Sequence, residues 1–140
     1  MTTYHVGGLN PIHRTKTIHE ALNDTIILHK SIDEAVSIEK PVTIKGNGHK
    51  WAIKPGTLGV SIQSPVILED IQFMVGGRAN AIVADAPITA INISTKIVGP
   101  VMAFYPTIFL RKGEHVFERC ILTAVTSEDG TSATFDDCIF

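Results

Sequence analysis

Four short segments each place two mostly polar residues at matching positions, and these residues are the ones in the chain best suited to chemistry. The pairs are Glu69-Asp70, Ile91-Asn92, Glu118-Arg119 and Asp136-Asp137. Stacked carboxylates could bind Ca²⁺, and Arg119 could act as the base on a uronide substrate. The simpler interpretation is that Arg119 and Asp137 form a surface ion pair between adjacent coils, worth about 0–1 kcal/mol. Asn92 would then be an ordinary bend residue.

The four segments align without gaps. They are LEDIQF, AINIST, FERCIL and FDDCIF, which begin at positions 68, 90, 117 and 135 and are therefore 22, 27 and 18 residues apart. Each reads apolar, two mostly polar positions, apolar, variable, and apolar or Thr. A fixed pattern with unequal spacing is typical of a solenoid whose connecting loops vary in length.

Stacking these segments predicts three inward columns, with the polar pairs at a bend. The first column is Leu68, Ala90, Phe117 and Phe135, the second is Ile71, Ile93, Cys120 and Cys138, and the third is Phe73, Thr95, Leu122 and Phe140. PVTIKGNG (41–48) extends the stack upstream, with Ile44 below Leu68, Lys45 below Glu69 and Gly46 below Asp70. Asn47 then falls where the other segments have Ile or Cys, so the match fails there.

Composition places the whole chain, residues 1–140, in one globular domain. Hydrophobic residues make up 44% and the net charge is −2, so neither disorder nor a nucleic-acid or membrane-surface partner is indicated. No apolar run has the length of a membrane span and no secretory signal is recognisable, which leaves the compartment open. Cys120 and Cys138 have no metal-ligand spacing and are predicted to be small core residues, and no cofactor is predicted.

The chain is predicted to be all-β, with very short strands and one short helix. KTIHEALND has a Thr17 cap with Glu20 three residues on, which is a capping box. Residues 1–23 are therefore expected to form an N-terminal cap, and residues 24–140 the coils of a parallel solenoid. Stretches such as TIILH, PVTIK and AIVA are too short for the usual sandwich of hairpins.

Two stretches resemble the right-handed parallel β-helix proteins of the pectin-lyase-like superfamily. YHVGG…KTIHEALNDTIILHKS is similar to the family's N-terminal entry, and SIEKPVTIKGNG to a frequent motif of its first coils; together they span Tyr4 to Gly48. The resemblance implies a right-handed β-helix with a helical cap. It does not select a function, because the superfamily includes polysaccharide lyases, pectinesterases, polygalacturonases, phage tailspikes, adhesins and binding domains.

Other candidate residues have a structural interpretation beside the functional one. Trp51 and Tyr105 could stack a sugar ring, although a Trp in a terminal coil more often packs. The histidines His5, His13 and His19 could approach one another near the cap and bind a metal, but exposed cap and loop histidines are the simpler prediction. Pectinesterase chemistry would need glutamine donors, and Gln63 and Gln72 lie in no recognisable motif.

The last segment ends at Phe140 without a polar cap, which leaves Phe135 and Phe140 on an open coil. Two explanations of this open coil are preferred: the chain is truncated from a longer β-helix, or it forms oligomers through this coil. The third explanation is that the end of a short chain is blunted locally. We therefore expect a non-catalytic module that binds a carbohydrate or protein, or assembles as a surface or phage-type component. The alternative is a polysaccharide-active enzyme of the lyase or glycoside-hydrolase kind, or a fragment of one.

Overall fold

The computed structural model describes residues 3–7, 14–15, 18, 25–98 and 106–140, and the described part contains strands and no helix. The strands are β1 (Thr3–Val6), β2 (Arg14–Thr15), β3 (Thr25–Leu28), β4 (Val36–Ile38), β5 (Val42–Lys45), β6 (Lys50–Ile53), β7 (Leu58–Ile62), β8 (Val66–Glu69), β9 (Gln72–Val75), β10 (Asn80–Ala84), β11 (Ile88–Ile91), β12 (Ser94–Ile97), β13 (Ile108–Leu110), β14 (Glu114–Glu118), β15 (Val125–Ser127) and β16 (Ser132–Asp136).

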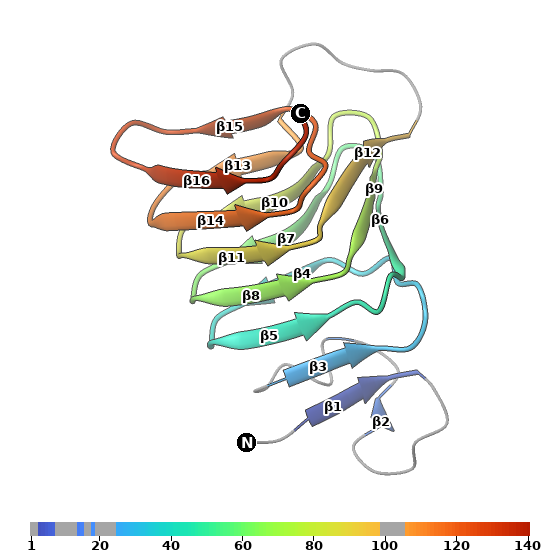
Figure 1. Cartoon of the computed structure of the whole chain (residues 1–140). Helices are drawn as coiled ribbons and strands as arrows, with labels where there is room; N and C mark the ends of the chain where they lie inside the picture. The colour runs from blue at the N-terminus through green and yellow to red at the C-terminus, as the bar shows by residue number, and fades with distance from the viewer. Residues whose placement is uncertain (1–2, 8–13, 16–17, 19–24, 99–105) are drawn as a thin grey trace.

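The strands stack into three parallel sheets that enclose one core (Figure 1). The first sheet has the order β16-β14-β11-β8-β5-β3-β1-β2, the second β12-β9-β6 and the third β15-β13-β10-β7-β4. One coil consists of β8, β9 and β10, and the next coil, β11, β12 and β13, lies directly on it. The chain passes from the first sheet to the second and then behind to the third while it rises, so the winding is right-handed.

The register confirms the first predicted column. Successive coils pair Ile44 with Leu68, Leu68 with Ala90, Ala90 with Phe117, and Phe117 with Phe135. The first four of these side chains are fully buried, whereas Phe135 is 37% exposed. Apolar residues at every second position of short strands therefore build one continuous ladder.

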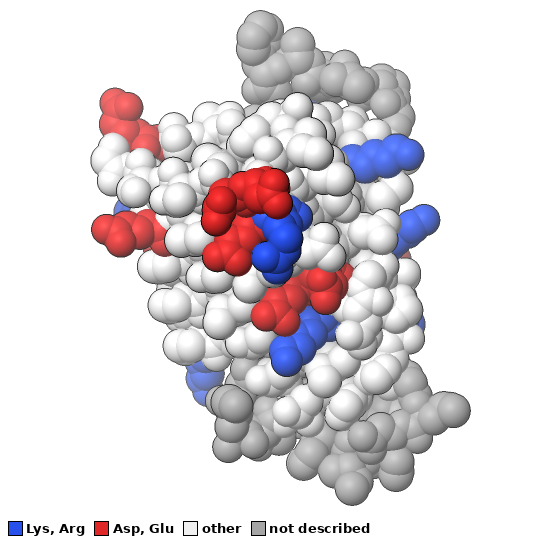
Figure 2. Space-filling view, viewed as in Figure 1, with Lys and Arg blue, Asp and Glu red and all other residues white. Residues whose placement is uncertain are grey.

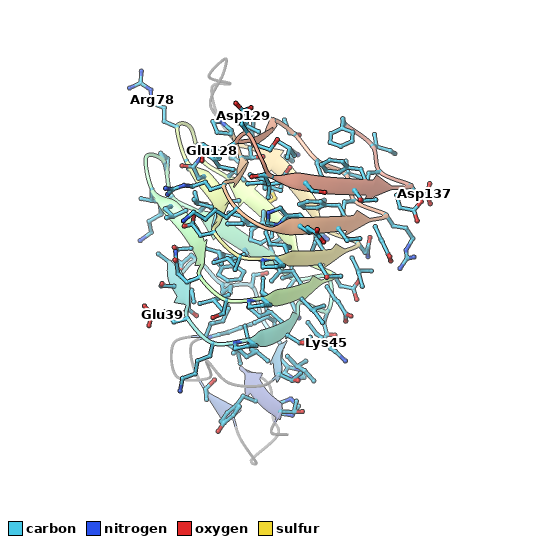
Figure 3. All side chains as sticks on the ribbon, turned by 90° about the vertical axis from the view of Figure 1, so that its left-hand side faces the viewer. Glu39, Lys45, Arg78, Glu128, Asp129 and Asp137 are labelled. Carbon is cyan, nitrogen blue, oxygen red and sulfur yellow. The ribbon has the colours of Figure 1, made fainter. Side chains whose placement is uncertain are left out.

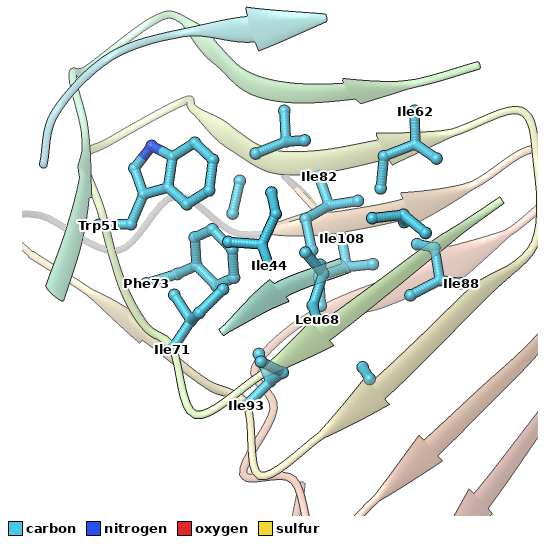
Figure 4. Close-up of a cluster of buried hydrophobic side chains, with 14 of the residues drawn as sticks. Ile44, Trp51, Ile62, Leu68, Ile71, Phe73, Ile82, Ile88, Ile93 and Ile108 are labelled. Atoms are coloured by element: carbon cyan, nitrogen blue, oxygen red, sulfur yellow. The ribbon is translucent and has the colours of Figure 1, made fainter. Parts of the chain in front are cut away.

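The other two columns are also inward over most of their length. Ile71, Ile93 and Cys120 are buried, as are Phe73, Thr95 and Leu122, and Figure 4 shows aliphatic and aromatic side chains from the three sheets meeting in the interior. In the last coil Phe140 is 70% exposed, as expected for a side chain on the open coil. Its ring packs edge-on against Phe135, with ring centroids 4.9 Å apart.

The prediction for PVTIKGNG needs a correction after Lys45. Lys45 pairs with Glu69 as expected, but Lys50 pairs with Gln72, so this bend contains two more residues than the bend above it. The extra length moves the left-handed bend conformation from Gly46 to Asn47, with φ 53°. Gly46 is instead buried against the next coil, where an added Cβ would lie 2.4 Å from Asp70 O.

The predicted capping helix in KTIHEALND lies outside the described residues, apart from Ile18. The Ile18 side chain is fully buried, and its backbone N–H donates to Glu34 Oε1. This contact anchors residue 18 to the side of the solenoid just before β4.

Candidate functional site

Every predicted polar pair lies at the bend between the first and second sheets. Glu69, Ile91, Glu118 and Asp136 are successive register partners, and each is followed by a residue with positive φ. We call the stacked residues of this bend the bend column: Lys45 and Asn47, Glu69 and Asp70, Ile91 and Asn92, Glu118 and Arg119, Asp136 and Asp137. Acidic and basic side chains gather over these strand ends at the centre of the face in Figure 2.

The backbone fixes the bend column. Asn47, Asp70, Asn92, Arg119 and Asp137 have φ between 52° and 55°, the left-handed region in which Asn and Asp are the most tolerated non-glycine residues. The amide N–H groups at the bend donate to the coil above: Asp70 N to Ile91 O at 3.1 Å and Asn92 N to Glu118 O at 2.9 Å. The pairs therefore stack because the bend itself is hydrogen-bonded from coil to coil.

Two asparagines add side-chain links to this column. Asn92 Nδ2 donates to Asp70 Oδ1 at 2.8 Å, one coil below. Asn47 Nδ2 donates to Leu28 O at 3.0 Å, at the end of β3. Asn92 is thus more than an ordinary bend residue, because it connects two coils and occupies one oxygen of a carboxylate that a Ca²⁺ site would need.

The ion pair predicted between Arg119 and Asp137 is not formed. Within the described residues, the ion pairs of the arginines join Arg111 to Asp85 and Glu128, on another bend. Arg119 and Asp137 are both exposed and, with Glu118 and Asp136, line an open hollow of about 510 Å³. The guanidinium is therefore available to a ligand at this end of the bend column.

The charge of the bend column is predominantly negative. It carries two cationic side chains, Lys45 and Arg119, against five carboxylates at positions 69, 70, 118, 136 and 137. In the part of the chain that the structure describes, no three His, Cys, Asp or Glu side chains are arranged to hold a metal ion. The column resembles a hydrogen-bonding surface more than a metal centre.

Trp51 cannot stack a sugar, because its side chain is fully buried. The indole packs against Phe73 with ring centroids 5.5 Å apart, and Nε1 donates to Glu34 O at 2.8 Å. This is the packing role that the sequence also allowed. The second predicted aromatic, Tyr105, lies outside the described residues.

Among the described histidines, His5 and His29 form an exposed pair and His115 is buried. His5 Nδ1 lies 2.8 Å from His29 Nε2, whereas His13 and His19, the predicted companions of His5, lie outside the described residues. His115 is buried in β14, where its Nδ1 accepts a hydrogen bond from Ile88 N at 3.2 Å and its Nε2 has no partner. Burial lowers the pKa of His115, and its contact with the Lys112 backbone opposes this effect.

A second polar column, not predicted from the sequence, follows the strands of the third sheet. Backbone N–H groups of Gln63, Asp85, Arg111 and Glu128 each donate to the strand end one coil below. Gln63 Nε2 donates to Asp85 Oδ2 at 3.3 Å, and Arg111 Nε lies 3.4 Å from Asp85 Oδ1. The sequence contains a partial signal for this column, because each of the four residues directly follows a short strand. The residue types differ between coils, so they form no repeated pattern. Glu128 and Asp137 lie on opposite sides in Figure 3, so the two columns are separate.

The side chain of Gln72 also makes a structural hydrogen bond. Gln72 Nε2 donates to Gly48 O at 3.1 Å, in the second sheet, whereas Gln63 lies at the end of the third. The two side chains do not converge on one site, which an oxyanion hole built from both would require.

The register and the buried columns define a parallel β-solenoid protein. No family model matches the chain, and neither a curated protein nor a solved structure matches it. Among the described residues there is no helix with the length and apolar character needed to cross a membrane.

Proposed function

We propose that this protein is a non-catalytic β-solenoid module that assembles with a second copy of itself through the coil of β16. One observation carries the proposal: positions that are buried in the lower coils are exposed in this one. Phe135 is 37% and Phe140 70% exposed, whereas Phe117 and Leu122, one coil below, are at most 1% exposed. Ile139 is outward-facing instead, because its partner Ile121 in the coil below is also exposed. Exposed aromatic and aliphatic side chains of this kind mark an interaction surface.

The strand itself supports a symmetric contact. Within the described residues β16 has β14 on one side and no strand on the other, so its outer backbone groups can pair with another strand. A two-fold axis through Thr134 would pair the two copies antiparallel, placing Ala133 of one copy opposite Phe135 of the other. Asp136 would then face Ser132 rather than a second Asp136, which avoids like-charge repulsion.

The oligomeric state in solution tests this proposal. Light scattering on a size-exclusion column should give a concentration-dependent dimer, and Phe140→Ser should shift it towards the monomer. Ile67→Ser removes an exposed aliphatic side chain from the face of β8 and should leave the dimer intact. A chain that stays monomeric at high concentration would contradict self-association and would leave a following segment of a longer chain as the occupant.

Carbohydrate binding at the bend column is a second candidate, favoured by the unpaired Arg119 guanidinium beside three carboxylates. As part of this second candidate we propose that the chain is related to the pectin-lyase-like superfamily. The alternative that it is a polysaccharide-active enzyme is proposed on the same basis. The net negative column would repel an acidic polysaccharide, so a neutral glycan suits it better than a polyuronide.

Calorimetric titration with neutral oligosaccharides and with oligouronides, each with and without Ca²⁺, would test the carbohydrate candidate. Binding of a neutral glycan that is lost in Arg119→Ala would support the site. Unsaturated uronide products, detected by their ultraviolet absorbance, would instead establish the lyase alternative. The absence of binding and of products would eliminate both.

A further inference from the structure

The two cysteines of the chain lie directly above one another. Glu118 pairs with Asp136 and Ile121 pairs with Ile139, so Cys120 and Cys138 are in register between these pairs. The Ile139 N–H donates to Cys120 O at 2.9 Å, which ties the two coils together at this level. Stacked strands are about 4.8 Å apart, within the range of about 4.4–6.8 Å between Cα atoms that a disulfide requires.

Both side chains point into the second inward column and are free thiols. Cys138 Sγ lies 3.3 Å from Phe117 O, a backbone atom of the coil that carries Cys120. The thiol of Cys138 is thus directed towards its neighbour. Cys120 Sγ lies 3.3 Å from Glu118 O and 3.6 Å from Ala90 O, a backbone atom of the coil below.

We propose that Cys120 and Cys138 form a disulfide that locks the coil of β16 onto the coil of β14. The neighbouring lower positions of this column, Ile71 and Ile93, are aliphatic, so the two topmost coils alone carry thiols. A disulfide brings the Cβ atoms to about 3.5–4.5 Å, slightly closer than the spacing of stacked strands. The coil of β16 can move to close this gap, because among the described strands it is held from one side.

The reaction balances with a disulfide oxidant such as oxidised glutathione. The half-buried thiol of Cys138 loses its proton and attacks the oxidant, which forms a mixed disulfide and releases one reduced glutathione. Cys120 then attacks Cys138 Sγ, and the second glutathione leaves as a thiol. Two thiols are oxidised and one glutathione disulfide is reduced. Burial and the adjacent Cys138 thiol raise the pKa of Cys120, so the second step should be faster at alkaline pH.

The bond would join two residues that are 18 positions apart in the sequence, and the loop that it closes contains β15 and β16. In a solenoid each coil contacts only its neighbours, so an end coil opens more readily than a central one. A covalent link between the last two coils would restrict this opening. It would leave the exposed Phe140 in place for the contact proposed above, on which this inference does not depend.

Incubation of the folded full chain with oxidised glutathione at mildly alkaline pH tests the proposal. Intact mass should fall by two hydrogen atoms, no thiol should be titratable in denaturant, and peptide mapping should link residues 120 and 138. Amides of β16 should exchange with solvent about 10- to 100-fold more slowly in the oxidised protein.

Cys120→Ser and Cys138→Ser are the matched controls, and neither should lose two hydrogen atoms. A stable mixed disulfide on Cys138 with Cys120 still reduced would overturn the proposal, as would a bond between two chains. Circular dichroism before and after oxidation shows that the starting protein is folded. Reversal by a reductant, with return of the original exchange rates, would confirm that the bond causes the slower exchange.

Discussion

Asn92 illustrates how one side chain can serve both the bend and the contact between coils. Its φ of 54° is a conformation that most L-residues avoid, and its amide donates to Asp70 Oδ1 at 2.8 Å. Asn is among the few residues that enter the left-handed region at little cost, because its short polar side chain bonds locally. The bend and the coil contact are therefore served by the same residue type.

Replacing Asn92 should expose both contributions. Asn92→Ala should lower the free energy of unfolding by about 1–2 kcal/mol, since it loses a hydrogen bond and strains the bend. Asn92→Gly keeps the conformation accessible and should cost less than Asn92→Ala. Urea titrations of the three proteins measure the difference, and equal midpoints for the wild type and Asn92→Ala would show that the bend is held by its backbone alone.

His115 is a buried residue whose pKa is lowered in the folded protein. It occupies the position that Ile88 fills in the coil below, with Nδ1 accepting from Ile88 N and Nε2 buried without a partner. Neutral imidazole with its proton on Nε2 fits this environment. A second proton on Nδ1 would face an N–H donor, so burial and geometry both oppose protonation.

Because of His115, the free energy of unfolding should therefore decrease at acid pH. Because the pKa of His115 is lowered in the folded protein, the unfolded chain binds the proton first as the pH falls. The contribution of neutral His115 to stability is fully present above the ordinary pKa of 6.5. It declines as the pH falls through 6.5 towards the lowered pKa of the folded protein. Urea midpoints at pH 7.5, 6.5 and 5.5 measure this decline. His115→Leu should reduce the slope, and an unchanged slope in that variant would assign it to other groups.

In the segment from β5 to β6, the strand could be predicted from the sequence and the turn that follows it could not. The strand VTIK was predicted with its register, because one apolar column must stack on the next. The two extra residues after Lys45 were not placed correctly, since the sequence shows a Gly-Asn-Gly turn without showing where the next coil touches it. Gly46 is needed for that contact, and Gly48 has a φ of +76° in open space.

The two glycines should respond differently to the same substitution. Gly46→Ala places a Cβ 2.4 Å from Asp70 O and 2.5 Å from a side-chain atom of Ile71. Moving backbone in a packed interior should cost about 1–3 kcal/mol or more. Gly48→Ala meets nothing within 4 Å and should cost about 1 kcal/mol for its left-handed backbone. Thermal or urea unfolding ranks the variants, and a larger loss for Gly48→Ala would contradict the close approach at Gly46.

At the scale of elements, the core could be predicted better than the site. The inward columns follow from a repeated apolar pattern, which survives even though coil length varies. The polar column of Gln63, Asp85, Arg111 and Glu128 was missed, because the backbone alignment of strand ends creates it and the residue types do not repeat. Trp51 was ambiguous for a related reason: a lone aromatic has no pattern that tells packing from stacking on a ligand.

The whole molecule is a linear stack, and its cohesion comes from contacts between consecutive coils. In the first sheet, β8 and β11 each have a neighbouring strand on both sides, whereas β16 has one neighbour in the described chain. The exposed side chains of Phe135 and Phe140 show the same asymmetry, since their counterparts in the coil below, Phe117 and Leu122, are buried. Local opening should therefore be easier at β16 than at β8 and β11.

Hydrogen exchange at dilute protein concentration should show this gradient directly. Amides of β8 and β11 should exchange most slowly, near the rate set by global unfolding, and those of β16 should exchange faster because opening one end coil breaks a single interface. Raising the protein concentration should slow exchange at β16 and leave β8 unchanged if a second copy covers that coil. Equal protection in all coils at low concentration would mean that the solenoid opens as one cooperative unit, and the end coil would then gain little from either a partner or a disulfide.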